Sequence, residues 1–460
     1  HYDDLLPGYM MHYCAFGISF DENSNYFEIL TPLYYKSFDC KTPDKRDITL
    51  SCDVEVEGAD LELTIDPGGW DGYYAYNIVS KSRSSSYFPP STVVDDELHR
   101  QWAKYWYTEY HLRVIDEGMP AEDFIALYCS KGLKTTHHTL YAMEDYVLVA
   151  YAIDIVEGVP QVVSPLYFQH FQTEEVGRAD LTVDVVFKEI YGRMVRFDII
   201  PSNDEDSYVA GIIKRDIIDT TADSVIIGAL TENIDPVNGA KFGKYSGEAL
   251  LLQPETEYVL CVVGSHGNMI TTDLMCFEFT TGVAEPCAVE VENVTFGGPY
   301  SIRELHEYDS WYLHSSYLDL PYFIYCLMWY EIETSGEPYK IYSYIFDTAD
   351  LEEDPYLAEV ELMRTPTNEL EAYIVHYDTE MVIWCCVMDD KGNLSEIYRT
   401  APFTLNIGDD RDPSEIAEVL DRIWGGTRST ETLFNEFKGV TLSEEAGAPT
   451  IEIIPISPIR

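Results

Sequence analysis

A layout of two strands separated by a turn recurs along this chain and constrains the fold more than any other feature. In the clearest copy, Leu252-Gln-Pro leads through Tyr258 into a continuous apolar strand, and a second strand closes on Phe279. The same layout surrounds three further pairs, which are Tyr146 with Phe171, Met381 with Phe403, and Met11 with Phe38. A long apolar strand, a Gly or Asn turn and a second strand are typical of the terminal hairpin of a β-sandwich.

The segments that precede two of these hairpins also repeat. Asp47–Val54 resembles Asp180–Phe187, Leu61–Pro67 resembles Val195–Pro201, and Tyr74–Val79 resembles Tyr208–Ile213. The offset between the copies stays at 133 or 134 residues. Three matches in order at a fixed offset indicate a repeat architecture, which must be recognised before any single domain is assigned.

The run from Leu252 through Pro254 and Thr256 to Tyr258, closed by Phe279, resembles the fibronectin type III pattern, in which the tyrosine makes a corner at the start of a strand. Over about residues 1–406 the chain resembles the fibronectin type III-like and immunoglobulin-like repeats of Bacteroidetes cell-surface lipoproteins. The resemblance implies an all-β dominated fold of tandem fibronectin type III-like β-sandwiches with short helical inserts. It also implies a scaffold or adhesive role, and it transfers no catalytic residues. Met11 and Met381 replace the tyrosine in two copies, so no hydroxyl corner bond is expected there.

Five segments are predicted. Residues 1–42 are the C-terminal strands of a partial β-sandwich repeat, 43–175 are a repeat with a helical insert at 94–129, 176–282 and 283–406 are two further repeats, and 407–460 are a helical segment and an extended tail. Further helices are predicted at 221–233, 349–363, 412–424 and 430–437. Asp412 is expected to be the N-cap of the third of these helices, with Pro413 at its first position.

The first repeat is incomplete in this sequence. Because a lone hairpin is marginally stable in water, we expect that residues 1–42 are completed by an N-terminal segment that this sequence lacks, after cleavage or nicking. The alternative is that the apolar residues 450–459 add a strand, either within this molecule or to a neighbour.

Charge limits the classes of partner. The chain has 29 Lys and Arg against 81 Asp and Glu, a formal net charge of −52, which repels nucleic-acid and anionic lipid phosphates. Its 36 Tyr, 19 Phe and 7 Trp are too many for a disordered acidic chain. No apolar run is long enough to span a bilayer. We therefore expect a folded protein with a protein or carbohydrate partner, on an outer-membrane surface or in the extracellular space, anchored through the segment missing at the N-terminus.

The ten cysteines form no Cys-x-x-Cys pair and are expected mainly as small buried residues. Two bridges remain open, Cys14 with Cys40 and Cys261 with Cys276, since each pair lies on strands expected to be neighbours. Cys385 and Cys386 are adjacent in a strand, so they should face opposite sides of a sheet.

No catalytic residues, metal ligands or cofactor are predicted. His137 and His138 should point to opposite faces of a strand, and the acidic runs at 203–206 and 409–412 do not fit a calcium loop, so they are interpreted as solvated loops. An aromatic stripe of Trp102, Trp106 and Tyr110 is interpreted as helix packing. The ligand-binding candidates are four aromatic residues at a loop–strand junction, Trp70, Tyr73, Tyr74 and Tyr76.

The sequence therefore predicts a non-catalytic cell-surface or secreted interaction scaffold. Its alternative is an accessory glycan-binding surface lipoprotein of an outer-membrane uptake system. A third reading is the binding part of a larger enzyme whose catalytic domain is missing.

Overall fold

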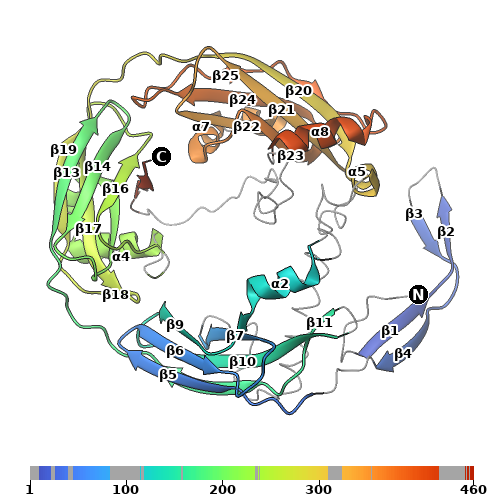
Figure 1. Ribbon diagram of the computed structural model, residues 1–460. Coiled ribbons are helices and arrows are strands. Elements are labelled where there is room, and N and C mark those ends of the chain that lie inside the picture. Colours follow the sequence, from blue (N-terminus) through green and yellow to red (C-terminus); the bar gives the residue numbers. More distant parts are fainter. Residues whose placement is uncertain are drawn as a thin grey trace. The chain divides into compact units, whose positions relative to one another are not determined.

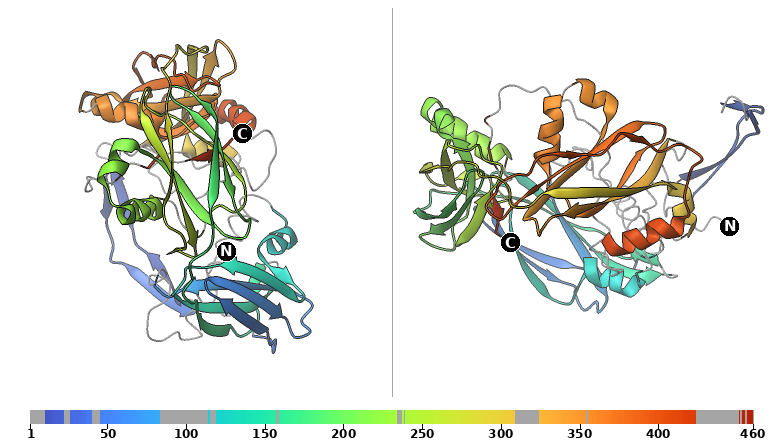
Figure 2. Two further views of the ribbon diagram at one scale, coloured as in Figure 1. Left: turned by 90° about the vertical axis from the view of Figure 1, so that its left-hand side faces the viewer. Right: turned by 90° about the horizontal axis from the view of Figure 1, so that it is seen from above.

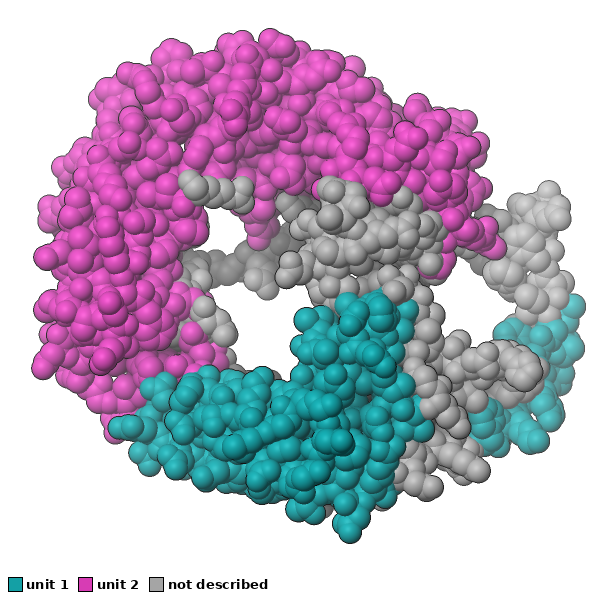
Figure 3. Space-filling view, in the orientation of Figure 1, with its two compact units in different colours: residues 1–138, 143–174 teal, residues 139–142, 175–460 magenta. Residues whose placement is uncertain are grey.

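The structure is a computed structural model that describes residues 10–21, 26–39, 45–82, 114, 119–156, 159–233, 237, 239–308, 324–353, 355–423, 451, 453, 454 and 456–459. The chain divides into two compact units (Figure 3). Unit 1 comprises residues 1–138 and 143–174, and unit 2 comprises residues 139–142 and 175–460. Both consist mainly of antiparallel sheets with a few short helices (Figure 1), which confirms the predicted fold class.

Two small hairpins lie at the start of unit 1. Strand β1 (Met10–Ala15) pairs antiparallel with β4 (Tyr34–Asp39), and β2 (Ile18–Asp21) pairs with β3 (Tyr26–Ile29). Among the described residues each forms a two-stranded sheet. Large apolar side chains here are exposed, namely Phe16, Leu30, Leu33, Tyr34, Tyr35 and Phe38. The predicted pairing of the first strand with the strand of Phe38 is thus observed.

The rest of unit 1, here called repeat 1, contains two antiparallel sheets. The first has the order β5 (Ser51–Glu57), β6 (Asp60–Asp66) and β9 (Lys134–Thr139). The second is built on the long strand β10 (Asp145–Val156), which pairs with β7 (Tyr73–Ser80), β11 (Val159–Val162) and β12 (Tyr167–Gln172), while β7 also pairs with β8 (Ser130–Lys131). Helix α2 (Ala121–Tyr128) places Phe124 and Ile125 in a cluster with the side chains of β10.

Repeat 2, in unit 2, has the same plan. One sheet has the order β13 (Val183–Ile190), β14 (Val195–Pro201) and β16 (Tyr245–Ala249). The other has β15 (Tyr208–Lys214), β17 (Glu257–His266) and β19 (Met275–Thr280), with the short β18 (Met269–Ile270) beside β17. The core between them is built on residues such as Phe197, Leu260 and Phe279. Helices α3 (Arg215–Thr220) and α4 (Asp223–Asn233) follow β15, and α4 packs on the far side of β15 and β17.

Repeat 3 also has two sheets. The first has the order β20 (Val291–Ser301), β21 (Tyr325–Thr334) and β23 (Leu370–His376). In the second, β24 (Glu380–Met388) pairs with β22 (Lys340–Asp347), β25 (Tyr398–Arg399) and β26 (Phe403–Thr404). Helices cover both outer faces (Figure 2). Helix α7 (Pro355–Arg364), preceded by α6 (Thr348–Glu353), packs on β22 and β24. Helix α8 (Pro413–Ile423) packs with α5 (Ile302–Tyr308) on the other sheet.

The register of the terminal hairpins is the same in all four copies. In each copy the tyrosine or methionine of the motif is the direct cross-strand partner of the closing phenylalanine. The four pairs are Tyr258 with Phe279, Tyr146 with Phe171, Met381 with Phe403, and Met11 with Phe38. The Gln253 amide donates a hydrogen bond of 2.9 Å to the Tyr258 hydroxyl oxygen, which is the expected tyrosine corner. The motif seen in the sequence is therefore a true structural repeat.

Most predicted helices are found where the structure describes the chain. Helix α4 lies in 221–233, and α8 begins at Pro413 with the Asp412 carboxylate accepting from the Ser414 amide at 2.9 Å, as an N-cap does. The helix expected at 349–363 is two helices, α6 and α7, because Pro355 lacks an amide hydrogen and begins a new helix. Of the insert 94–129 only residue 114 and residues from 119 on are described, so Trp102, Trp106 and Tyr110 lie outside the described residues, as does 430–437.

The C-terminal segment adds a strand to repeat 2. Strand β27 (Ser457–Pro458) pairs with β16, and Ile454 pairs with Ile212 of β15. The alternative that residues 450–459 act as a strand within the molecule is therefore observed, although the strand completes repeat 2 and not the hairpins at the N-terminus.

Candidate functional site

The aromatic residues predicted to bind a ligand lie around the start of β7 and differ in exposure. Trp70 and Tyr73 are half-buried, and the Trp70 Nε1–H donates to the Tyr73 carbonyl oxygen at 3.1 Å. The Arg46 guanidinium lies 5.6 Å from the Trp70 ring centre and the Lys131 ammonium 5.4 Å from that of Tyr73. Each ring thus carries a cation on one face, at a separation suited to cation–π attraction.

Tyr74 is a core residue. Its side chain is fully buried, and its hydroxyl donates to the Gly132 carbonyl oxygen at 2.9 Å. Tyr208, its counterpart in repeat 2, is buried in the same way and donates to the Gly243 carbonyl oxygen at 2.9 Å. Burial raises the pKa of both hydroxyls. Because Tyr74 fills the core, contact with a ligand is left to Trp70, Tyr73 and Tyr76.

Tyr76 belongs to a polar contact that sequence reasoning missed. Its hydroxyl lies 3.3 Å from both Thr136 Oγ1 and His138 Nε2. His138 is half-buried beside it, and burial lowers the pKa of its imidazole. His137 is exposed and lies 3.5 Å from the Glu62 carboxylate, so the two histidines face opposite sides of β9 as the alternation of a strand predicts.

The acidic runs have local partners. Asn203 accepts hydrogen bonds from the amides of Glu205 and Asp206, which closes a turn at 203–206. Asp412 caps α8, and Asp410 accepts from the Tyr377 hydroxyl. Within the described residues there is no group of three or more His, Cys, Asp or Glu side chains arranged to hold a metal ion.

The prediction that two pairs of cysteines lie on neighbouring strands is confirmed for one pair. Cys261 and Cys276 are direct partners across β17 and β19, and both are free thiols. Cys385 and Cys386 belong to clusters on opposite faces of β24. Cys14 is described but Cys40 lies outside the described residues.

We expect Cys276 to be alkylated by iodoacetamide faster than the buried Cys326 and Cys385. A hydrogen bond from Cys261 lowers the pKa of the exposed Cys276 thiol, whereas burial raises the pKa of Cys326 and of Cys385 to about 12. The thiolate is the reactive form, so the ratio of the rates should be largest at pH values below the pKa of Cys276 and should shrink as the pH rises above it. Peptide mapping by mass spectrometry measures each rate, and equal rates at the three positions would contradict the expectation.

A buried charged group with partners from two repeats lies between repeats 2 and 3 of unit 2. Glu248 of β16 is fully buried. Its carboxylate accepts hydrogen bonds from the Tyr339 hydroxyl at 2.6 and 2.5 Å and from Arg196 Nε at 3.4 Å, and Lys340 Nζ lies 3.9 Å away. The Arg196 guanidinium also lies 5.1 Å from the Tyr339 ring centre. We call these four residues the Glu248 joint.

The Glu248 joint connects the two repeats by buried polar contacts. Arg196 and Glu248 come from repeat 2. Lys340 is the first residue of β22 in repeat 3, and Tyr339 directly precedes it. Burial and the hydrogen bond to Glu248 raise the pKa of the Tyr339 hydroxyl. Such hydrogen bonds in a site with little water are stronger than on the surface, and they hold one arrangement of the groups. The sequence gives no signal for this joint, because Glu248 is one of 81 acidic residues.

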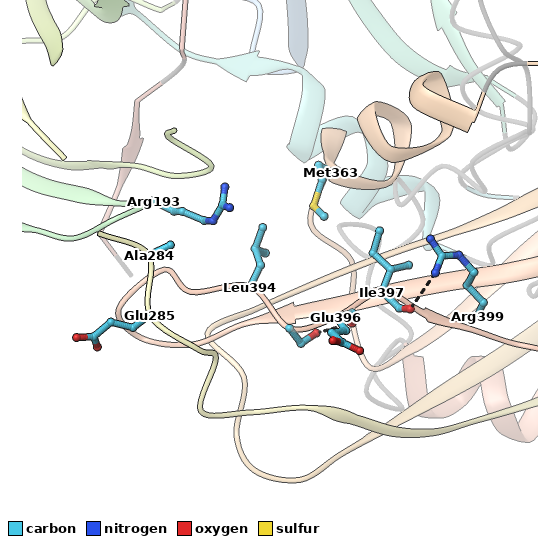
Figure 4. Close-up of a pocket in the computed structure, with 9 residues that line it drawn as sticks. Arg193, Ala284, Glu285, Met363, Leu394, Glu396, Ile397 and Arg399 are labelled. Carbon is cyan, nitrogen blue, oxygen red and sulfur yellow. Dashed lines mark hydrogen bonds between the residues drawn. The ribbon is translucent and has the colours of Figure 1, made fainter. Parts of the chain in front are cut away.

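A cavity of about 500 Å³ lies beside the same junction. It is lined by Arg193, Ala284, Glu285, Met363, Leu394, Ser395, Glu396, Ile397 and Arg399 (Figure 4). Figure 4 shows Leu394 and Ile397 extending toward the side of Met363, with the Glu285 carboxylate directed away from them. Arg399 is held 4.3 Å from the Trp384 ring centre and donates to the Ile397 carbonyl oxygen at 3.5 Å. The lining is mixed, with an apolar floor and two guanidinium groups.

No protein-family model and no curated protein matches the chain. Among solved structures, the crystal structure of the FN1–FN3 domains of chicken CNTN1 matches with 9% sequence identity, 79% of this chain and 99% of that chain covered, and a TM-score of 0.19. Because this TM-score is low, the fold assignment rests on the strand orders and the hairpin register of the chain itself. These orders describe tandem fibronectin type III-like sandwiches.

Proposed function

We propose that the chain is a non-catalytic interaction scaffold, secreted or held at a cell surface, in which a series of sandwiches presents inserted helices and loops to a protein partner. The Glu248 joint carries this proposal. A buried carboxylate bonded to residues of both repeats gives a preferred arrangement of repeats 2 and 3. A fixed spacing is what a scaffold needs in order to present several surfaces at once.

The inserts differ between the repeats while the strand framework stays the same. Repeat 2 carries α3 and α4 after its third strand, and repeat 3 carries α6 and α7 at the equivalent place. Loops and inserts on a rigid framework are where binding surfaces concentrate. The net charge of −52 favours a partner with a cationic surface. A location outside the cell is supported by the use of this sandwich architecture in many cell-surface domains.

A second candidate is glycan binding at Trp70 and Tyr73. Both rings are half-buried, lie three residues apart at a loop–strand junction, and keep part of their surface in contact with solvent. Flat aromatic side chains with a polar handle are suited to a ligand with one apolar face. In this reading the chain is an accessory protein of an outer-membrane sugar uptake system.

The two candidates are separated by testing the full chain on a glycan array and against immobilised basic proteins. The scaffold proposal expects silence on the array and binding to a cationic protein that weakens about tenfold or more as salt rises from low to physiological concentration. Saturable glycan binding that is lost in Trp70→Ala and kept in Tyr34→Ala, an exposed aromatic residue of the N-terminal hairpin, would favour the second candidate instead.

The described helices were also compared with the length and hydropathy that a membrane-spanning helix requires. Among the described residues, no helix combines the length and the hydropathy needed to cross a membrane.

A further inference from the structure

We propose that the edge of repeat 2 between β15 and β16 is a strand-binding site, and that the C-terminal segment of a second copy of this chain can occupy it in place of the chain's own. Copies would then be joined by exchanged strands. The occupant is the apolar C-terminal segment of a second copy. The structure describes residues 451, 453, 454 and 456–459 of this segment.

The segment bonds to the edges of both sheets of repeat 2. The Ile454 amide donates to the Ile212 carbonyl oxygen at 2.9 Å, and the Ile212 amide donates to the Ile454 carbonyl oxygen at 3.2 Å. Further along, Ser457 lies opposite Glu248 in β16, and the Ile459 amide donates to the Ser246 carbonyl oxygen at 3.4 Å. Among the described residues, β15 and β16 are each the last named strand of their sheet without this segment, although Lys241 makes a bridge with Tyr208 at the start of β15. Unpaired edge strands are templates for pairing with another chain.

The side chains of the segment divide between two apolar clusters. Ile454 and Ile456 pack on the core between the sheets, whereas Ile451 and Ile453 pack on the cluster under α4. The segment therefore fills the position beside β15 and β16 that local strands occupy in other immunoglobulin-like sandwiches. In repeat 2 the local chain at this point forms α3 and α4 instead.

The completing strand is remote in sequence from the domain that it completes. The strands of repeat 2 end at Thr280, all of repeat 3 follows, and 27 residues, 424–450, separate α8 from the segment. At about 3.3–3.6 Å per residue, 27 residues have a maximum reach of roughly 90 Å, which is greater than the diameter of a small domain. The contacts with β15 and β16 are identical whether the segment comes from the same chain or from another copy. Exchange of an identical element between copies therefore costs little, and it is favoured by high protein concentration.

The test uses cysteines placed at the paired positions of the full chain. In the double variant Ile212→Cys/Ile454→Cys, the paired positions are suited to a disulfide, since partners that exchange both backbone bonds have Cα atoms about 5.5 Å apart. In a mixture of the single variants Ile212→Cys and Ile454→Cys, a 212–454 disulfide can form only between two copies. The mixture is incubated at high concentration in a glutathione redox buffer, and the bridge is identified by peptide mapping. The matched donor control is Ile453→Cys, which packs on the other cluster.

The proposal expects a 212–454 bridge within the double variant and between copies in the mixture, with at least fivefold less bridging to position 453. A bridge in the double variant without one in the mixture would show that β15 and β16 pair only with the segment of their own chain, and would overturn the exchange. No bridge in either would overturn the strand-binding site itself. If the variants do not fold, native mass spectrometry of the unaltered chain decides. Dimers that grow with protein concentration and fall with excess peptide of residues 449–460 support exchange, and a monomer at all concentrations contradicts it.

Discussion

The variant Arg196→Met is expected to lower the free energy of unfolding of unit 2 by about 2–4 kcal/mol. Removing one partner of a buried ion pair usually costs about 3–5 kcal/mol, because a charge is left without compensation. Here the cost is smaller, since Glu248 keeps the Tyr339 hydroxyl at 2.5–2.6 Å and Lys340 at 3.9 Å. The side chain of Arg196 is 18% exposed and that of Glu248 is 0% exposed, so little water can replace the lost contact.

Urea unfolding followed by circular dichroism measures the change. The control is Arg215→Met, because Arg215 binds Asp219 and Glu278, which are exposed, and its loss should leave the midpoint unchanged. The double variant Arg196→Met/Glu248→Met should recover only part of the stability, since an apolar pair replaces the ion pair but the Tyr339 hydroxyl and the Lys340 ammonium lose their acceptor. Equal midpoints for Arg196→Met and Arg215→Met would mean that the Glu248 joint does not stabilise unit 2.

The second large effect is expected at the closing phenylalanine of the terminal hairpins. Phe279→Ala should destabilise repeat 2 by about 3–5 kcal/mol, because it removes a large buried ring and leaves a cavity. Phe279 is 6% exposed and its ring centre lies 5.0 Å from that of Phe187 and 5.7 Å from that of Tyr258.

The chain contains its own matched control for this substitution. Phe38 occupies the same register position in the N-terminal hairpin but is 38% exposed. Phe38→Ala should therefore change stability by less than about 1 kcal/mol, since little apolar surface is buried there. Differential scanning calorimetry of the two variants provides the comparison. A large effect of Phe38→Ala would show that the N-terminal hairpin is buried against a partner in solution.

The framework of the repeats could be predicted because strand patterns are local. The sequence alone shows that β5, β6 and β7 correspond to β13, β14 and β15. The evidence is the alternation of apolar residues, the Gly and Asn turns and the fixed offset between the copies. The same comparison pairs Tyr74 with Tyr208, and both are buried residues that bond a glycine carbonyl. A residue that repeats at the same position of a framework is better interpreted as part of the core than as a ligand contact, and this signal could have removed Tyr74 from the candidate site.

The contacts between remote segments could not be predicted in this way. Whether an acidic residue in an acidic chain is buried depends on which surface packs on it, and Glu248 is buried because Tyr339 of the next repeat covers it. The apolar character of residues 450–459 indicates a strand but not whether that strand pairs within the molecule or with a neighbour. The choice of β15 and β16 depends on two sheet edges and two apolar clusters that exist only after repeat 2 has folded.

The sequence by itself thus determined the repeated sandwich, the tyrosine corner, the capped helix α8 and the opposite faces of Cys385 and Cys386. These features follow from backbone periodicity and short-range hydrogen bonds, which neighbouring residues fix. Only the tertiary structure decided the Glu248 joint and the place of the C-terminal strand. Both depend on burial and edge pairing between segments far apart in the chain, and no local pattern encodes which distant surfaces meet.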